Sequence, residues 1–196
     1  ENLFKKIKNK NINYISMNRQ NCIYLPNFFR LNKKTMKEDK YCTFESQSLI
    51  NKQILQNKNS IVILGGNFGD YFIKTDPEWL YKNNSDLEVI DGFKNAIDEL
   101  LLNDITVLLI YPIPAVGWHV PRRLMNEIPK TSFNVSEYLS KNKFTTELDD
   151  YFNYNKPIIE FFNQIDHPNF LKVFPHKVFC DEYITRKCLT HDEKNI

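Results

Sequence analysis

A glycine pair and an asparagine that follow a short apolar run are the strongest local signal for chemistry. The run Ile61–Leu64 ends at Gly65 and Gly66, and Asn67 comes next. Glycine permits close backbone approach and positive φ angles, so we expect Gly66 and Asn67 to face a ligand. An asparagine side-chain N–H at such a place can donate to the oxyanion of a tetrahedral intermediate. The alternative is a glycine-rich turn that only lets the chain leave a sheet.

A second segment, Tyr111–Arg123, carries side chains suited to binding a substrate. Trp118 could stack on a sugar or an acyl group, and His119 could add a polar contact. Pro112 and Pro114 stiffen the segment. The alternative is a rigid surface loop with a packed tryptophan and a solvated histidine.

Several common catalytic and binding signatures are absent from the sequence. It contains no G-x-S-x-G elbow and no Gly-Asp-Ser motif, so no serine nucleophile can be nominated. The glycines fit neither a Walker loop nor a G-x-G-x-x-G fingerprint. No two histidines have metal-ligand spacing with a nearby carboxylate, and we expect neither a metal nor another cofactor.

The cysteines fall into two local pairs, Cys22 with Cys42 and Cys180 with Cys188. Neither pair has the C-x₂-C spacing of zinc sites or thioredoxin-like redox motifs. Two local pairs are compatible with two disulfides, and hence with an oxidising compartment. Four buried thiols in a cytosolic protein fit the same spacing.

Alternating strands and helices are expected to position the two candidate segments. A wholly apolar run predicts a strand at Ile61–Leu64, and a second apolar run, interrupted by Thr106, predicts one at Ile105–Tyr111; both are expected to be buried, with Ile61–Leu64 covered on both faces. A third strand is expected at Phe170–Phe174. The other predicted elements are a strand at 12–17 and helices at 1–9, 43–56, 85–102 (with a Ser85/Glu88 capping box) and 145–165 (with a kink or break at Pro157), while residues 18–42 are expected to be irregular.

This alternation predicts an α/β fold, a three-layer αβα sandwich around a central parallel sheet. In such sheets ligands bind at the carboxyl ends of the strands. We therefore expect Gly65–Asp70, the loop that begins at Pro112 and the residues from Pro175 onward to lie along one rim.

Composition limits the classes of protein and of partner. A length of 196 residues with 42% hydrophobic and 26% charged residues fits one globular domain. The net charge of +2 gives no reason to expect a nucleic-acid partner. The longest apolar run, Ile105–Pro114, is too short to span a bilayer. Because the chain opens at Glu1 without a signal peptide, we expect it to start inside a longer protein.

Five segments, in order, resemble the extracytoplasmic SGNH domain that is fused to integral-membrane acyltransferases. They are Glu1–Phe4, Asn21–Pro26 with Cys42, Ile61–Tyr71, Val107–Pro121, and Phe174–Cys188. The third departs from the pattern, because Asn67 and Phe68 stand where relatives often carry an Arg-Trp pair. The resemblance covers essentially the whole chain, residues 1–196, and implies a single domain of the SGNH/flavodoxin-like α/β fold. It also implies the disulfides Cys22–Cys42 and Cys180–Cys188 and a periplasmic or otherwise extracytoplasmic location.

The family's nucleophile lies in a Gly-Asp-Ser-His block and its base in an Asp-x-x-His block, and this sequence contains neither. We expect them just before Glu1 and just after Ile196, which would leave this chain incomplete at both ends and inactive alone. The resemblance implies that the intact protein passes an acyl group, expected to be acetyl, through an acyl-serine to a cell-envelope glycan such as lipopolysaccharide. The implied partners are the membrane acyltransferase domain of the same polypeptide and the glycan acceptor. The alternative is a non-catalytic glycan-binding or partner-docking module on the same fold.

Overall fold

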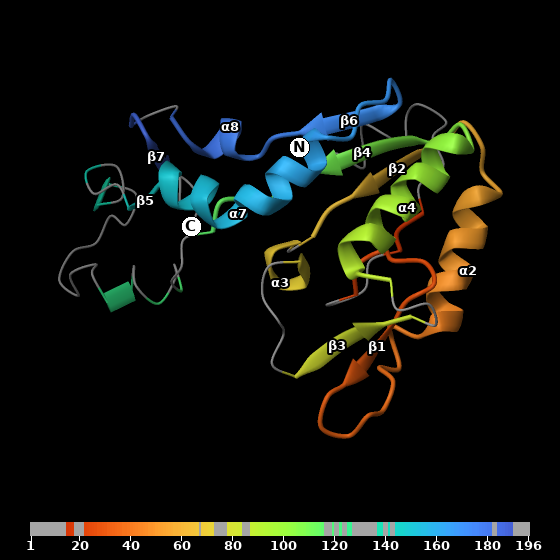
Figure 1. Ribbon diagram of the computed structural model, residues 1–196. Helices are drawn as coiled ribbons and strands as arrows, with labels where there is room; N and C mark the ends of the chain where they lie inside the picture. The colour runs from red at the N-terminus through yellow and green to blue at the C-terminus, as the bar shows by residue number, and fades with distance from the viewer. Residues whose placement is uncertain are drawn as a thin grey trace.

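A parallel three-stranded sheet is the core of the fold and lies in the upper part of the view in Figure 1. The computed structural model describes residues 15–17, 22–66, 68–72, 78–83, 87–115, 119, 122, 125–126, 137–138, 141, 144–181 and 184–189. The sheet has the order β2-β4-β6, with β2 at Ile61–Leu64, β4 at Thr106–Ile110 and β6 at Phe170–Val173. Both neighbouring pairs are parallel. The predicted α/β fold with a central parallel sheet is therefore confirmed, and the three predicted core strands are present.

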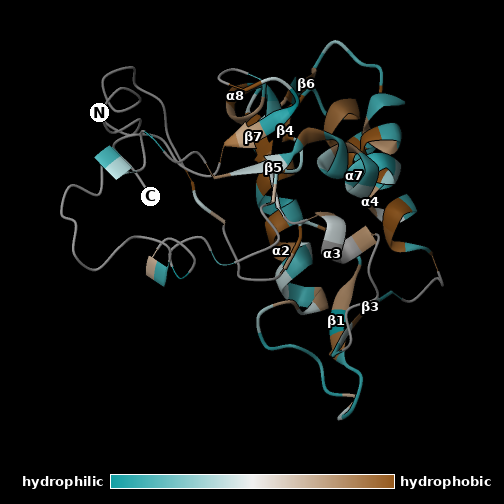
Figure 2. Cartoon of the chain, turned by 90° about the vertical axis from the view of Figure 1, so that its left-hand side faces the viewer, coloured by the Kyte–Doolittle hydropathy of each residue, from teal (hydrophilic) through white to brown (hydrophobic). Residues whose placement is uncertain are grey.

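Two helices cover one face of this sheet, α4 (Val89–Leu102) and α7 (Leu148–Asn163) (Figure 2). They bury apolar side chains against the strands, because every second strand residue points to their side. The fully buried part of this core includes Phe93, Ile97 and Leu100 of α4, Val107 and Leu109 of β4, and Ile158 and Phe162 of α7.

The opposite face of the sheet is largely exposed in the described part of the chain. Ile61 is 64% exposed and Ile63 is 58% exposed, and Leu171 and Val173 on β6 are also exposed. The expectation that β2 is covered on both faces is therefore wrong for the described residues. The described residues do not show the second helix layer of the expected sandwich on this face.

Helix α2 (Phe44–Leu55) begins where the sequence predicts. Thr43 is its N-cap, and its hydroxyl oxygen accepts the Ser46 N–H at 3.1 Å. Gln47 of this helix is buried, and its amide donates to Ile23 O at 2.7 Å and accepts the Leu25 N–H at 3.2 Å. These bonds fix the extended segment around residue 23 on the helix.

Helices α4 and α7 differ from their predictions in detail. Glu88 is the N-cap of α4 and makes no side-chain capping bond, so the predicted capping box is wrong, since its glutamate would have to lie inside the first turn. Helix α7 begins at Leu148, after a short strand β5 (Thr145–Glu147), and continues through Pro157. The predicted break at Pro157 is therefore not observed.

Smaller elements flank the central sheet (Figure 1). Strands β1 (Phe29–Asn32) and β3 (Trp79–Lys82) form an antiparallel pair, which corrects the expectation of an irregular 18–42 segment. Strands β5 and β7 (Lys187–Leu189) form another antiparallel pair. The remaining helices are α3 (Phe68–Phe72) and α8 (His176–Phe179). Residues 15–17 form no strand, against the prediction for 12–17, whereas residues 12–14 and the predicted helix 1–9 lie outside the described residues.

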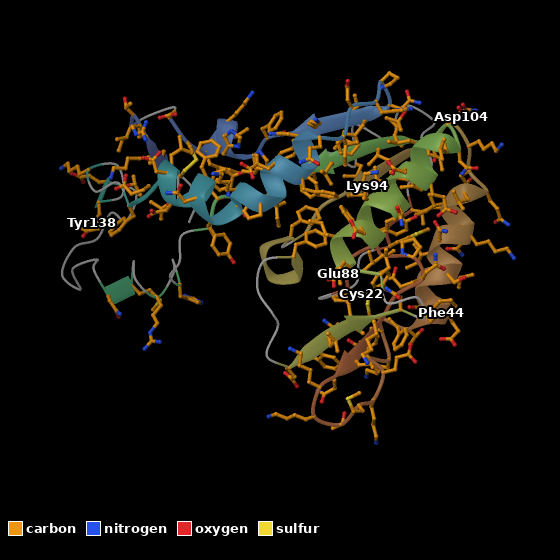
Figure 3. All side chains as sticks on the ribbon, in the orientation of Figure 1. Cys22, Phe44, Glu88, Lys94, Asp104 and Tyr138 are labelled. Atoms are coloured by element: carbon orange, nitrogen blue, oxygen red, sulfur yellow. A yellow bond between two sulfur atoms is a disulfide. The ribbon has the colours of Figure 1, made fainter. Side chains whose placement is uncertain are left out.

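All four cysteines form disulfides, in the pairs that the family resemblance implies. Cys22 is bonded to Cys42 with a Cα–Cα distance of 5.7 Å, and Cys180 to Cys188 with 3.9 Å. Figure 3 shows the side chains, with Cys22 labelled beside the β1–β3 pair. The second disulfide joins residues that face each other across an antiparallel bridge. The disulfides thus fix residue 22 near the start of α2, and the end of α8 to β7.

Candidate active site at the carboxyl rim of the sheet

The carboxyl ends of β2, β4 and β6 lie along one edge of the sheet because the three strands are parallel. Gly65 and Gly66 follow β2, Tyr111 and Pro112 follow β4, and His176 comes three residues after the end of β6. A Cβ built on Gly65 would lie 3.5 Å from the Ile110 Cβ, so the ends of β2 and β4 are direct neighbours. The described parts of the two candidate segments therefore meet at the rim, as expected.

The backbone conformation does not require glycine at position 65 or 66. Neither Gly65 nor Gly66 has a φ in the left-handed region, so the chain does not use the positive φ angles that glycine permits. A Cβ on Gly65 would make an ordinary contact with Ile110, and one on Gly66 would meet no atom within 4 Å. Gly66 therefore borders open space at the rim, where a ligand can approach its backbone.

The structure places only part of the predicted site. Asn67, the expected oxyanion donor, and Trp118, the expected stacking residue, lie outside the described residues. His119 is exposed, and its Nδ1 accepts the Arg122 N–H at 3.2 Å. That bond gives His119 a local turn-stabilising role, and its part in substrate binding stays a prediction.

A buried hydrogen-bond cluster supports the rim beneath the loop that follows β4. The Tyr151 hydroxyl of α7 donates to Pro112 O at 3.0 Å, and His176 Nδ1 lies 3.4 Å from the same hydroxyl. The Tyr111 hydroxyl donates to Asn163 Oδ1 at 2.8 Å. Two tyrosine hydroxyls thus join α7 to the chain at the end of β4, that of Tyr151 on the helix and that of Tyr111 just after the strand.

Three aromatic rings lie close to His176. Its ring centroid lies 5.3 Å from Tyr151, 5.2 Å from Phe152 and 5.8 Å from Phe174. Burial, with a smaller contribution from the Lys177 charge, lowers the pKa of His176 below its usual 6.5. The imidazole is therefore neutral at pH 7, and it can act there as a hydrogen-bond partner without bringing a charge to the rim.

The two rim tyrosines remain protonated over the physiological pH range. Burial raises the pKa of Tyr151 to about 12, and burial with the nearby Tyr151 raises the pKa of Tyr111 to about 12. Both hydroxyls therefore keep their protons and act as hydrogen-bond donors, and neither acts as a base.

Sequence reasoning did not identify Tyr151, and it assigned His176 no role. His176 follows β6 and Pro175, a position that a parallel sheet predicts to lie on the rim. Tyr151 contacts a residue 39 positions away, and a helical pattern carries no signal for such a contact. Gly69 of α3 belongs to the predicted rim segment Gly65–Asp70, and a Cβ there would lie 2.9 Å from the Tyr154 Cε1 of α7.

Comparison with known families decides the identity of the fold. The sequence matches the family described as SGNH domain (fused to AT3 domains) over residues 1–195. The chain belongs to this SGNH domain family. No curated protein and no solved structure matches the sequence. In the SGNH domain, the Gly65–Gly66 turn and the loop after β4 occupy the carboxyl rim, where an α/β sheet binds its ligands.

Two further properties of the SGNH domain concern metal ions and membranes. Among the residues that the structure describes, no group of three His, Cys, Asp or Glu side chains is arranged to hold a metal ion. Within the same residues, no helix has both the length and the apolar character needed to cross a bilayer.

Proposed function

We propose that this SGNH domain works on the extracytoplasmic side of a membrane acyltransferase and transfers an acyl group, acetyl in the simplest case, to a cell-envelope glycan such as lipopolysaccharide. The observation that carries the proposal is the match over residues 1–195 to SGNH domains fused to AT3 domains. That fusion supports a membrane acyltransferase domain on the same polypeptide. The parallel rim at Gly66 and Pro112 supports a single reaction site on this domain.

The proposed chemistry is acyl transfer through an acyl-serine. A serine hydroxyl attacks the carbonyl of the acyl donor while a histidine takes its proton, and the donor's leaving group departs with that proton. The histidine then takes the proton of a sugar hydroxyl that attacks the acyl-serine, and the serine leaves with its own proton restored. Because the sequence contains no Gly-Asp-Ser motif, we assign the serine, and the Asp-x-x-His base, to residues of the parent polypeptide outside 1–196.

The residues of this chain would bind and stabilise rather than attack. The Asn67 side-chain N–H and the Gly66 backbone N–H would donate to the oxyanion of the tetrahedral intermediate. The open space at Gly66 supports this, because an acyl group can approach that backbone without a clash. Trp118 would stack on the acceptor sugar, with His119 as a polar contact beside it.

The two disulfides support an oxidising location. Structural disulfides persist in the periplasm and outside cells, and they are rare in a reducing cytosol. Each disulfide includes a buried cysteine, Cys42 at 0% and Cys188 at 2% exposure, so neither is an adventitious bond between exposed thiols. A periplasmic domain tethered to its membrane domain fits this chemistry.

The first experiment measures turnover of a nitrophenyl acetate by the full-length protein. Asn67→Ala should lower turnover by about 10²–10³, the usual cost of removing one oxyanion donor. Asn103→Ala is the matched control, because Asn103 precedes β4 at the opposite end of the sheet, and it should leave turnover unchanged. Equal turnover in all three proteins would remove the oxyanion role of Asn67.

The second experiment separates acceptor binding from hydrolysis. Trp118→Ala should reduce transfer to the glycan more than it reduces hydrolysis of the same ester. Equal losses in both reactions would assign Trp118 to packing. A serine-directed fluorophosphonate probe that does not label the full-length protein would favour a non-catalytic glycan-binding module.

A further inference from the structure

A basic hairpin, residues 30–42, projects from the domain at the bottom of Figures 1 and 2, away from the central sheet. Leu31 of β1 forms an antiparallel bridge with Glu38 on the returning chain. The hairpin carries five cationic and two acidic side chains, a net charge of +3, whereas the whole chain has a net charge of +2. Four of the five cations are exposed lysines, namely Lys33, Lys34, Lys37 and Lys40.

The acidic groups of the hairpin, and of Glu78 beside it, are engaged within the fold. Asp39 is buried, and the Arg30 Nε donates to its Oδ2 at 2.8 Å. The Glu38 carboxylate accepts a backbone N–H at the start of α2 at 3.0 Å. The Glu78 carboxylate accepts the Asn32 side-chain N–H at 3.3 Å. The exposed charge that the hairpin presents is therefore mainly that of its lysines.

Hydrogen bonds hold the tip of the hairpin in one conformation. The Asn32 Oδ1 accepts the backbone N–H groups of Lys34 and Thr35, both at 3.0 Å. The Asn32 carbonyl accepts the Met36 N–H at 2.8 Å, and the Asn32 N–H donates to Lys37 O at 2.9 Å. Such a preordered basic surface loses less conformational entropy on binding than a flexible lysine-rich segment would.

Two exposed side chains with apolar character stand among the lysines. Met36, at the tip, is 60% exposed, and Tyr41 is 56% exposed. The Lys40 Nζ lies 4.4 Å from the centroid of the Tyr41 ring. Tyrosine is enriched where a membrane meets water, and lysine can lay its methylene chain on apolar surface while its ammonium group stays in water. Cations around an apolar tip thus fit a lipid surface.

We propose that this lysine hairpin docks the domain on an anionic phospholipid surface, with its lysines at the lipid phosphates and Met36 in the interface. The proposal rests on the proposed function, because a membrane acyltransferase domain on the same polypeptide would hold the SGNH domain beside a bilayer. Anionic lipids attract clusters of about four or more basic residues that lie next to a membrane-spanning domain. Docking through the hairpin would fix the orientation of the carboxyl rim relative to the membrane.

Other anionic partners fit the hairpin less well. Lysine is depleted in the interfaces between proteins. Arginine is the side chain that grips a single phosphate with two parallel hydrogen bonds, and Arg30, the one arginine of the hairpin, is buried and paired with Asp39. The exposed lysines act as point charges, which suit a surface of many phosphates better than one fixed phosphate group.

Co-sedimentation with lipid vesicles tests the proposal. The protein should bind vesicles of equal parts phosphatidylglycerol and phosphatidylcholine, and it should not bind vesicles of phosphatidylcholine alone. Binding should weaken as salt is added, because salt screens the attraction. The double variant Lys34→Gln/Lys37→Gln should bind about 25-fold more weakly, since each lysine near an anionic surface contributes about fivefold.

Lys52→Gln/Lys58→Gln is the matched control, because it removes the same charge elsewhere. Both lysines are exposed, and they lie in the last turn of α2 and just beyond it, at the end of the helix away from the hairpin. This variant should bind within about twofold of the parent, because charges beyond a Debye length of the surface are screened. Equal losses in the two double variants would overturn the proposal, because overall charge would then explain the binding.

Met36→Gln tests the apolar part of the interface at unchanged charge. It should weaken binding to the anionic vesicles by about threefold, because the apolar contact with the lipid is lost. Unchanged affinity would remove Met36 from the interface. Binding to soluble polyphosphate without binding to phosphatidylglycerol vesicles would overturn the membrane as the partner.

Labelling of the full-length protein by a fluorophosphonate separates this proposal from the proposed function. Labelling together with no binding to anionic vesicles would refute the docking surface and leave the acyl-serine mechanism standing. Hairpin-dependent binding to vesicles without labelling would support the docking surface and refute the mechanism.

Discussion

Replacing Gly92 by alanine should destabilise the domain, although alanine is the better helix former. Gly92 lies in α4, and a Cβ there would come within 2.3 Å of Phe28 Cε2 and 2.6 Å of its Cζ. Phe28 is only 2% exposed, so its ring has little room to move. Glycine at this position thus lets the ring pack directly on the helix.

Two opposing terms set the size of the effect. Forcing extra volume into a packed core costs about 1–3 kcal/mol, and so severe an overlap belongs at the upper end. The helix propensity of alanine returns about 1 kcal/mol. We therefore expect Gly92→Ala to lose about 2 kcal/mol of unfolding free energy.

Gly69→Ala is the matched comparison, with a clash of a different kind. Its Cβ would lie 2.9 Å from the Tyr154 Cε1, but Tyr154 is 40% exposed, so its ring is less confined than that of Phe28. The gain in helix propensity, at most about 1 kcal/mol, should offset most of the smaller steric cost, so we expect a net change within about 0.5 kcal/mol. The two variants thus test whether burial of the neighbouring ring determines the cost.

Urea unfolding of the oxidised protein, followed by circular dichroism, measures both variants. In a Phe28→Leu background the two nearest ring atoms are absent, and Gly92→Ala should become neutral or stabilising by up to about 1 kcal/mol. A Gly92→Ala protein more stable than its parent, or an equal loss in both backgrounds, would refute the steric reasoning.

Three further predictions concern the rim and the disulfides. Tyr151→Phe removes the donor to Pro112 O and should cost about 1–2 kcal/mol of unfolding free energy; an unchanged urea midpoint would show that this bond contributes nothing. The folded pKa of His176 lies below its unfolded value of 6.5, so its contribution to stability is present above that value and is lost as pH falls through the folded pKa. NMR titration of the His176 ring should give a midpoint below 6.5, and a midpoint at or above 6.5 would contradict the effect of burial. His176→Gln should make the free energy of unfolding less sensitive to pH between about 7 and 5. Removing Cys22–Cys42, which spans 20 residues, should cost more than removing Cys180–Cys188, which spans 8, about 3.3 against about 2.5 kcal/mol on loop entropy alone; the reverse order in urea unfolding would show that native contacts outweigh loop length.

The central sheet was predictable because its strands have a local signal. The apolar runs at Ile61–Leu64 and Ile105–Tyr111, the second interrupted only by Thr106, identify β2 and β4 without knowledge of their partners. Thr43 predicts the start of α2 in the same way, since a cap acts within one turn. These features depend on residues within a few positions of each other.

The remaining features depend on contacts between distant segments. Strand β1 pairs with β3, some 50 residues later, so the sequence around Phe29 gives little sign of it. Conversely, the strand pattern that includes Ile15 forms no strand, because backbone groups need a partner as well as a pattern. At the rim, Tyr151 contacts Pro112 across 39 residues, and no local rule predicts such a bond. The family resemblance supplied the disulfide pairing, which spacing had left open.

The Cys180–Cys188 bond also determines what a protease could do to this end of the domain. The loop that it encloses contains Arg186 and Lys187, where a trypsin-like enzyme cuts. After such a cut the two pieces would remain covalently joined, with β7 still paired to β5. A single cut behind Arg186 would therefore leave the molecule in one piece until a reductant opened the disulfide.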